Sequence, residues 1–370
     1  MSQDVSSHQD TSDQHQDTSA QPSFSLDFAY AHGTPLCEGD FRTEPEDFCV
    51  TEHLGFPLLG SGEHVYLNVK KVGENTHWVA RRIAELAGVR EMDVGYGGKK
   101  DRHAVTTQWF SVYMPKATSV DWQALNSSSV TLLNHTRHSA KLRRGDHAGN
   151  TFNIRLRNLS SIARESQSDS NYHISSGDWW QAVELRMNAI LEQGVPNYFG
   201  EQRFGRGGAN LVWAQRWLVD GEKIRDRQKR SMTLSAARSY LFNRVLSDRI
   251  DQGTWHQWFE GDVPVESGSG GISQSPTGPL WGRGRPLSSG QVVQWERQSL
   301  SSLKSWCDAL EHQGLSQERR RLCLLPEEFQ WQREENDLVL QFGLLSGEYA
   351  TSVLREIARL KERSKAPPVI

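Results

Sequence analysis

The segment GYGGKKDRHAVTTQWFSV, residues 95–112, joins a glycine-rich run to a strand-like run of residues. A nucleotide-binding P-loop would need the pattern Gly-x-x-x-x-Gly-Lys-Ser/Thr followed by a helix. Here Lys100 is followed by Asp101, and strand-like sequence comes next. The segment therefore disfavours a nucleotide enzyme built on a P-loop and leaves one carboxylate among three cations to be explained.

An amphipathic helix is predicted just before this segment, in NTHWVARRIAELAGV, residues 75–89. Apolar residues recur there at helical spacing and share one face, and Gly88 is the expected end of the helix. The residues of that face are Val79, Ile83, Leu86 and Ala87. The glycines at 95, 97 and 98 are then predicted to connect this helix to a strand, where glycine permits positive φ and close backbone approach.

The rest of the chain alternates between two kinds of pattern. Residues 23–175 are mixed, whereas helical patterns dominate from about 176 to 324, with a Gly, Ser and Pro-rich stretch at 261–290 that predicts a long loop. Near the end, residues 337–360 predict a strand, a turn and an amphipathic helix. The simplest account is an insertion, in which 176–324 interrupts a unit made of 23–175 and 325–370. Residues 1–22 are predicted to be a disordered polar tail.

Composition limits the class of protein. The chain has 370 residues, of which 36% are hydrophobic and 24% are charged, and it has no apolar run of the roughly 18 residues that a membrane span needs. Its N-terminus lacks the pattern of a secretory signal. The four cysteines form no Cys-x-x-Cys pair, which argues against a zinc site and against a disulfide framework. These features predict a protein of the reducing cytoplasm that binds no metal. No heptad pattern or apolar stripe calls for a dimer, so a monomer is expected.

Local charge indicates a polyanionic partner. The formal net charge is −3, but the tail holds four aspartates and no Lys or Arg, which leaves +1 for the remainder. Residues 137–157 carry six Lys or Arg against one Asp, and residues 223–230 carry five against one. Either cluster alone is more often a solvated face. Two clusters with aromatic residues nearby favour a nucleic acid contacted over a wide surface.

Three groups of residues are candidates for chemistry or binding. Asp101, flanked by Lys100 and Arg102, is expected to stay ionised and to serve as a nucleophile or a base; the alternative is a surface ion pair at a turn. Asn150 and Phe152 alternate on a predicted strand, and an amide beside an aromatic ring suits a nucleobase. The alternative for Phe152 is a core position. If Phe152 contacts the base, its replacement by Ala is expected to abolish turnover and to leave the fold near wild type.

Arginine and aromatic residues also interleave on the glycine-rich stretch VPNYFGEQRFGRGG, residues 195–208. Phe199 and Arg203 there suit contact with RNA, and a structural corner plugged by Phe199 is the alternative. Strand-like alternation in PEDFCVTEHLGF, residues 45–56, sets Phe48, Val50 and Glu52 on one face.

Six motifs together resemble the TruD family of tRNA pseudouridine synthases, in order and spacing, from about residue 30 to 360. They are PEDFCVTE, GYGGKKDRHAVTTQWFSV, GNTFNIRLR, VPNYFGEQRFG, RDRQKRSMTLSAARSYLFN and YATSVLREI. The resemblance implies an α+β fold. It also implies that a pseudouridine-synthase-like catalytic domain with a mixed, mainly antiparallel sheet (23–175 plus 325–370) is interrupted by a helix-rich α/β insertion domain (176–324). The insertion domain is expected to face the catalytic domain across an RNA-binding cleft.

The resemblance also implies an activity, because members of this family convert uridine 13 of tRNA to pseudouridine without a cofactor or a metal. It implies that Asp101 is the catalytic carboxylate and that Phe48, Asn150 and Phe152 line the uracil pocket. Lys100, Phe199 and Arg203 complete the set of predicted substrate-binding residues. A non-catalytic RNA-binding or chaperone protein is the alternative; such a protein would be indifferent to the identity of Asp101.

Overall fold

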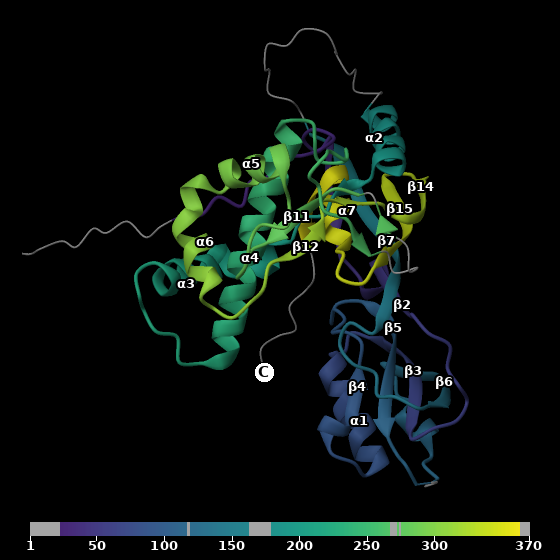
Figure 1. The fold of residues 1–370 in the computed structure, drawn as a ribbon. Helices are drawn as coiled ribbons and strands as arrows, with labels where there is room; N and C mark the ends of the chain where they lie inside the picture. Colours follow the sequence, from purple (N-terminus) through teal and green to yellow (C-terminus); the bar gives the residue numbers. More distant parts are fainter. Residues whose placement is uncertain (1–22, 117–118, 163–178, 267–271, 274, 363–370) are drawn as a thin grey trace, which may run out of the picture.

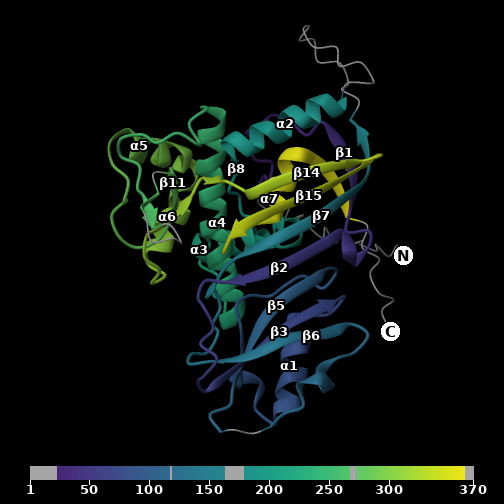
Figure 2. The same cartoon turned by 90° about the vertical axis from the view of Figure 1, so that its right-hand side faces the viewer.

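The computed structural model describes residues 23–116, 119–162, 179–266, 272–273 and 275–362. Its largest element is a ten-stranded sheet, seen along its length in Figure 2. Seven of its strands follow one another in the order β14, β15, β7, β2, β5, β3, β6. Their bounds are β14 Glu327–Glu334, β15 Asp337–Leu345, β7 His147–Ser161, β2 Phe48–Leu54, β5 Val105–Tyr113, β3 His64–Val72 and β6 Val130–His138.

The sheet is mixed and mainly antiparallel. Within the seven-strand order, β2 and β5 run parallel and the other neighbours run antiparallel. Three more strands attach to it: β1 (Cys37–Phe41) pairs with β7 and, in parallel, with β16 (Ala358–Glu362), and β4 (Val94–Tyr96) pairs with β5. Helix α1 (Thr76–Ala87) covers β3 and β5, and its Val79 and Ile83 are buried there. These features confirm the predicted α+β class.

The last part of the chain completes the sheet that the first part begins. Strand β15 pairs with β7 from Leu338 opposite Leu156 to Leu345 opposite Gly149, and β16 pairs with β1. Helix α7 (Ala350–Ile357) lies between β15 and β16 in the chain. This pairing is what the insertion account requires, and the domain limits at 175, 176 and 324 stay predictions.

A helical unit lies beside the sheet (Figure 1). Its helices are α3 Ala209–Leu218, α4 Arg227–Asp251, α5 Gly290–Ser299 and α6 Lys304–Glu311. On α4, Ala237, Leu241, Val245 and Leu246 are fully buried in the core of this unit. The helix begins at Arg227, because the Asp226 side chain caps it by accepting a hydrogen bond from the Lys229 N–H at 2.5 Å.

Two segments connect the units by packing. Helix α2 (Trp179–Gln193) falls in the predicted insertion, yet its Val183 and Met187 are buried in the core of the sheet. Conversely, Phe28 precedes the first strand and stacks on Tyr198, with ring centroids 5.3 Å apart, in the core of the helical unit. Burial of these side chains opposes hinge motion between the two units. The predicted tail, residues 1–22, lies outside the described residues.

Two predictions of local structure need correction. The stretch 261–290 is not simply a loop, because it contributes strand β11 (Thr277–Leu280), which pairs with β12 (Glu318–Arg321). Short ladders also join β9 (Val265–Glu266) to β10 (Ile272–Ser273) and β8 (Val195–Pro196) to β13 (Cys323–Leu324). The second correction concerns the end of the segment 337–360, where a helix was predicted and strand β16 begins at Ala358. The sequence of β16, ARLKE, has too few apolar residues to predict a strand.

No helix in the described ranges combines the length and the apolar character that crossing a bilayer requires.

Candidate active site

A cleft of about 1040 Å³ runs between the sheet and the helical unit. Its walls come from the β1 to β2 connection, the loop between β4 and β5, the start of β7, the chain after β8, and α7. All of the residues predicted for the site line it: Phe48, Lys100, Asp101, Asn150, Phe152, Phe199 and Arg203. The fold thus brings together side chains that are scattered over 156 positions of sequence, from 48 to 203. Their roles stay predictions.

The glycines before Asp101 are required for close approach. Gly95 lies in β4, so the loop connects two strands, and Gly95, Gly97 and Gly98 all lie outside the positive-φ region. A Cβ on Gly95 would overlap the Leu142 carbonyl oxygen, and one on Gly97 would lie 3.1 Å from the His147 ring. The expectation of positive φ is therefore wrong at these positions, and the expectation of close backbone approach is confirmed.

Buried polar groups hold the backbone of this loop. The Thr76 hydroxyl accepts a hydrogen bond from the Lys100 N–H at 2.9 Å. The Lys71 ammonium, which is fully buried, donates to the carbonyl oxygens of Glu74 at 2.7 Å and Asp101 at 2.9 Å. The main chain at Asp101 is thus fixed by a side chain of the neighbouring strand β3.

The partner of the Asp101 carboxylate is Arg42. Its Nη2 donates to Asp101 Oδ2 at 2.8 Å, and its Nη1 donates to Glu362 at 3.0 Å. The guanidinium lies 4.4 Å from the Phe48 ring centroid, and the Arg42 side chain is only 9% exposed, whereas Asp101 is 45% exposed. A buried cation therefore holds one carboxylate oxygen while the rest of the Asp101 side chain faces the cleft.

This pairing corrects the predicted role of the flanking cations. Lys100 and Arg102 contact other groups, the latter donating to the Gly73 carbonyl at 3.2 Å. Arg42 is 59 residues from Asp101 in the chain, and neither spacing nor composition points to it. Its backbone has φ 57°, a value that a side chain makes unfavourable, so the local structure keeps Arg42 in a strained conformation.

Lys100 organises the floor of the cleft. Its ammonium lies 2.8 Å from Glu52 Oε2 and donates to Asn150 Oδ1 at 2.5 Å, and this ion pair is buried. Glu52 and Asn150 are register partners on β2 and β7, so the sheet itself sets this geometry. Because Lys100 occupies the amide oxygen, the Asn150 amide group directs its N–H donors to other acceptors. Asn150 is thus prepared to donate to a ligand.

His147 borders the same floor as a neutral side chain. Burial lowers its pKa, and the nearby Lys100 charge lowers it further. At neutral pH the ring therefore adds a polar group to the cleft without adding a positive charge.

Phe48 and Phe152 belong mainly to the core. Phe152 is 8% exposed and stacks on Phe342, with ring centroids 5.5 Å apart, while Phe48 lies 6.0 Å from it. The structure thus favours the core alternative for most of the Phe152 ring, with one edge in the cleft. The expectation that Phe152→Ala leaves the fold near wild type is inconsistent with this burial.

We expect Phe152→Ala to lower the free energy of unfolding by about 3–5 kcal/mol, the usual effect of emptying a buried Phe site. Phe152→Leu keeps most of the volume and should lower it by less than about 1.5 kcal/mol. Urea unfolding of the three proteins measures both values. Equal stability of wild type and Phe152→Ala would show that the ring is not part of the core.

The far wall is a stack of cations and rings. Phe199 lies between the guanidinium groups of Arg203 and Arg320, at 5.3 and 4.2 Å from its centroid. Arg203 donates to the Tyr349 hydroxyl at 2.6 Å and to Ser235 at 2.9 Å. Arg203 is therefore engaged in holding α7 and α4 together. Its neighbours Arg320 and Tyr349 were not among the predicted site residues.

Lys71 gives a pH dependence of stability. Burial lowers its pKa from 10.5 to about 8, with the Asp101 charge acting in the opposite direction. Between pH 8 and 10.5 the unfolded chain then binds the proton and the folded chain does not, so stability rises with pH across this window. The shift corresponds to about 3 kcal/mol at most.

Comparison with Lys71→Met isolates this effect. Burial raises the pKa of the Cys37, Cys307 and Cys323 thiols to about 12, which lowers stability above pH 9 in both proteins alike. The difference in unfolding free energy, wild type minus Lys71→Met, should therefore increase from pH 8 to 10.5 in urea titrations. Parallel pH curves for the two proteins would contradict a depressed Lys71 pKa.

Comparison with known proteins gives one consistent family. The model of the family described as tRNA pseudouridine synthase D (TruD) matches residues 27–223 and 269–357. The tRNA pseudouridine synthase D of Cellvibrio japonicus is 47% identical over 348 residues, covering 93% of this chain and 96% of the relative. That of Methylococcus capsulatus is 45% identical over 349 residues, covering 90% and 94%.

A solved structure shares the fold. The crystal structure of the putative tRNA pseudouridine synthase D from Methanosarcina mazei superposes with a TM-score of 0.66 at 20% identity, covering 89% of this chain and 95% of that one. A sequence identity of 20% supports only the shared fold. The family model and the relatives above 40% identity show the family. The chain belongs to the tRNA pseudouridine synthase D (TruD) family.

Proposed function

We propose that this protein converts uridine 13 of tRNA to pseudouridine and that the Asp101 carboxylate carries the chemistry. Family membership supports the tRNA substrate and the isomerisation. The observation that carries the residue assignment is the position of Asp101, held by Arg42 at 2.8 Å and exposed to a cleft that Asn150 and Phe152 also line.

The reaction defines what the carboxylate must do. The N1 to C1′ bond of uridine breaks, the uracil turns, and C5 bonds to C1′. N1 gains a proton and C5 loses one, so the product is an isomer and the electrons balance. Asp101 acts either as a nucleophile at the sugar or the base, or as the base that takes the C2′ proton to form a glycal. Because the oxidation state does not change, the proposed reaction needs no redox cofactor.

Asn150 and the two phenylalanines are proposed to receive the uracil. The target base must leave its stack in the folded tRNA, at a cost of a few kcal/mol. Contact with the parts of Phe48 and Phe152 that line the cleft returns part of this energy, and the Asn150 amide donates to a uracil carbonyl oxygen. The buried Glu52 to Lys100 pair keeps Asn150 in the orientation that this requires.

Affinity for tRNA is proposed to come largely from phosphate contacts, so it should fall with salt. Two arginines of the first predicted basic cluster already form ion pairs within the protein. Arg155 pairs with Glu334 and Asp337, and Arg157 pairs with Asp47. The remaining cations of those clusters are candidates for RNA contact. Arg203 lies outside them and bonds to Ser235 and Tyr349, but it lines the cleft and is a further candidate.

A non-catalytic RNA-binding protein is the alternative function. It would use the same cleft and the same cations, and it would not need a carboxylate held by a buried arginine. A P-loop nucleotide enzyme is disfavoured further, because the loop after Gly98 leads into strand β5 and not into a helix.

We also propose a cytoplasmic monomer. The described cysteines, Cys37, Cys49, Cys307 and Cys323, are all free thiols, which suits a reducing compartment. Sedimentation at several concentrations would report the oligomeric state.

The proposed function is tested by incubating unmodified tRNA with the purified protein. Carbodiimide treatment followed by primer extension should then give a stop that reports pseudouridine at position 13. A tRNA with cytidine at that position is the matched control. Absence of the stop under conditions in which the protein binds tRNA would favour the non-catalytic alternative.

A further inference from the structure

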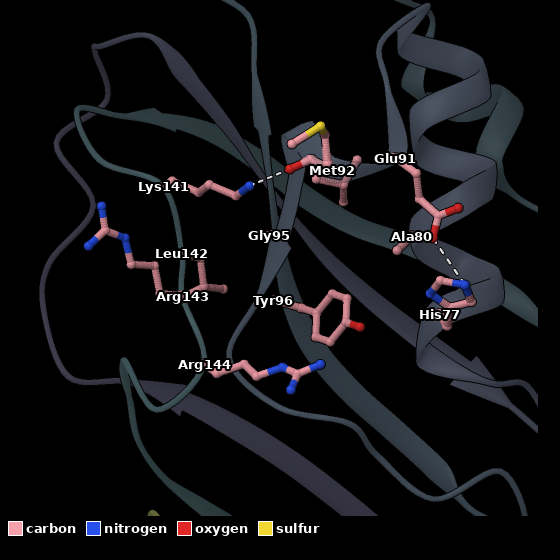
Figure 3. Close-up of a pocket in the computed structure, with 11 residues that line it drawn as sticks. His77, Ala80, Glu91, Met92, Gly95, Tyr96, Lys141, Leu142, Arg143 and Arg144 are labelled. Atoms are coloured by element: carbon pink, nitrogen blue, oxygen red, sulfur yellow. Dashed lines mark hydrogen bonds and ion pairs between the residues drawn. The ribbon is translucent and has the colours of Figure 1, made fainter. Parts of the chain in front are cut away.

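A second cavity of about 600 Å³ lies apart from the cleft, beside α1 and β4 (Figure 3). One wall is the α1 side with His77, Ala80, Glu91 and Met92, and the other is the loop after β6, residues 141–144. Tyr96 of β4 extends into the space between them, and Arg144 reaches toward it from the loop (Figure 3). The pocket thus combines an aromatic ring with cationic side chains.

Its positive charge is available for a ligand. Arg143 and Arg144 are exposed, and within the described residues their guanidinium groups have no hydrogen-bond or ion-pair partner. The lining acid, Glu91, pairs with Arg81 at 3.8 Å, and its other carboxylate oxygen lies 3.0 Å from His77 Nε2. Asp146 is adjacent, but it accepts the Arg143 backbone N–H at 2.5 Å and caps the turn.

The walls of the pocket are rigid. Lys141 Nζ donates to the Met92 carbonyl at 2.5 Å, which links the loop to the segment before β4. The Leu142 N–H donates to the Ser111 hydroxyl at 2.9 Å, and Tyr96 packs on Phe110 with centroids 6.1 Å apart. Both arginines leave the same hydrogen-bonded turn: Arg144 extends toward the Tyr96 ring, and Arg143 extends to the other side of the loop (Figure 3). A ring beside one cation, with a second cation next to it in the chain, suits a base or a ribose with adjacent phosphates.

The same loop borders the catalytic cleft at its other end. His147, which lines the cleft, follows Arg144 by three positions, and the Gly145 N–H donates to the Gly97 carbonyl oxygen of the Asp101 loop at 3.0 Å. Three positions span at most about 10 Å, even in an extended chain, and about three stacked nucleotides cover that length. A polynucleotide bound in the cleft can therefore reach the second pocket within about three nucleotides.

We propose that this pocket binds a nucleotide of the substrate RNA that flanks the target uridine, with Arg143 and Arg144 contacting phosphates and Tyr96 contacting the base or ribose. The proposal rests on the proposed tRNA substrate and deepens it, because it assigns a binding subsite outside the catalytic cleft. It predicts a role in affinity and register, not in the chemical step.

The test uses the double variant Arg143→Gln/Arg144→Gln in the full chain. Because these side chains have no partners in the described fold, the variant should fold as wild type. The slope of log affinity for tRNA against log salt should become shallower by about 1.4–1.8, the value for two lost phosphate contacts at 0.7–0.9 each. The matched control is Arg285→Gln/Arg297→Gln, two exposed arginines of the helical unit.

The outcomes are distinct. The subsite proposal is overturned if the double variant keeps the wild-type salt slope, or if the control variant shows an equally shallow slope. The proposed function is unaffected by either result as long as wild type makes pseudouridine. Binding is scored whether or not pseudouridine forms, so failure of the proposed function is seen separately in the wild-type reaction.

A second measurement locates the RNA. A photo-crosslinking residue in place of Met92, which is 68% exposed on the rim of the pocket, should crosslink to a nucleotide within a few positions of uridine 13. The same residue in place of Leu185 on α2, 65% exposed, serves as control. Crosslinking from position 92 only to distant nucleotides would contradict the proposed continuity with the cleft.

Discussion

Asp101→Asn is expected to lower pseudouridine formation by at least about 10³-fold, within the 10²–10⁴-fold range typical of a lost acid–base group. The amide has nearly the same shape as the carboxylate but can act neither as a nucleophile nor as a base. Arg42 keeps its contact with Glu362, so the buried guanidinium remains partly paired. Binding of tRNA should stay as tight as in wild type or become slightly tighter, because a negative charge facing the polyanion is removed.

The measurement is the single-turnover rate of pseudouridine formation together with a binding titration. Asp308→Asn is the matched control, since Asp308 is also an exposed aspartate paired with a cation, Lys304, at 2.6 Å, on α6 of the helical unit. The control should react at the wild-type rate. Full activity of Asp101→Asn would remove Asp101 from the chemistry and return it to the surface ion-pair alternative.

Arg42→Met is expected to lower the rate of the chemical step by about 10²-fold, which is the effect of misplacing a catalytic group by about 1 Å. Arg42 acts through Asp101: its guanidinium fixes one carboxylate oxygen and is itself held between Glu362 and the Phe41 and Phe48 rings. Arg42 is therefore a positioning residue, and Arg42→Lys, which retains a cation, should recover part of the rate.

A purely structural role for Arg42 would give a different pattern. Arg157→Met breaks another arginine–carboxylate pair, with Asp47 at 2.7 Å, outside the lining of the cleft. That control should lose stability without a change in the saturated rate. If Arg42→Met behaves in the same way, with stability reduced and the saturated rate retained, then Arg42 does not position Asp101.

Local patterns predicted much of the fold because they report on burial along a single element. Helix α1 has the bounds that its apolar spacing and Gly88 indicated, with Gly88 in the left-handed conformation at φ 65°. On β2 the alternation of Phe48, Val50 and Glu52 matches their burial. Even the buried carboxylate in that series follows the alternation, although its partner Lys100 comes from a loop about fifty positions later.

Local patterns do not predict contacts between segments that are distant in the chain. The pairing of Asp101 with Arg42 depends on the β1 to β2 connection meeting the β4 to β5 loop, and no local signal encodes that meeting. The same holds for Arg320 and Tyr349 around Phe199, which come together only when β12 and α7 enclose the chain after β8. Arg42 stands in FRTEPEDF, immediately before a predicted strand. A single arginine in such a position is too common to predict a contact with Asp101.

The central claim is that the Asp101 carboxylate drives uridine isomerisation in tRNA. It is tested most directly with tRNA carrying tritium at C5 of its uridines, because bonding of C5 to C1′ releases the C5 hydrogen to water. Wild-type protein should release the label of one uridine per tRNA, mapped to position 13, and Asp101→Asn should release none on the same time scale while binding the tRNA. Equal release by the two proteins, or no release by wild type bound to tRNA, would contradict the account.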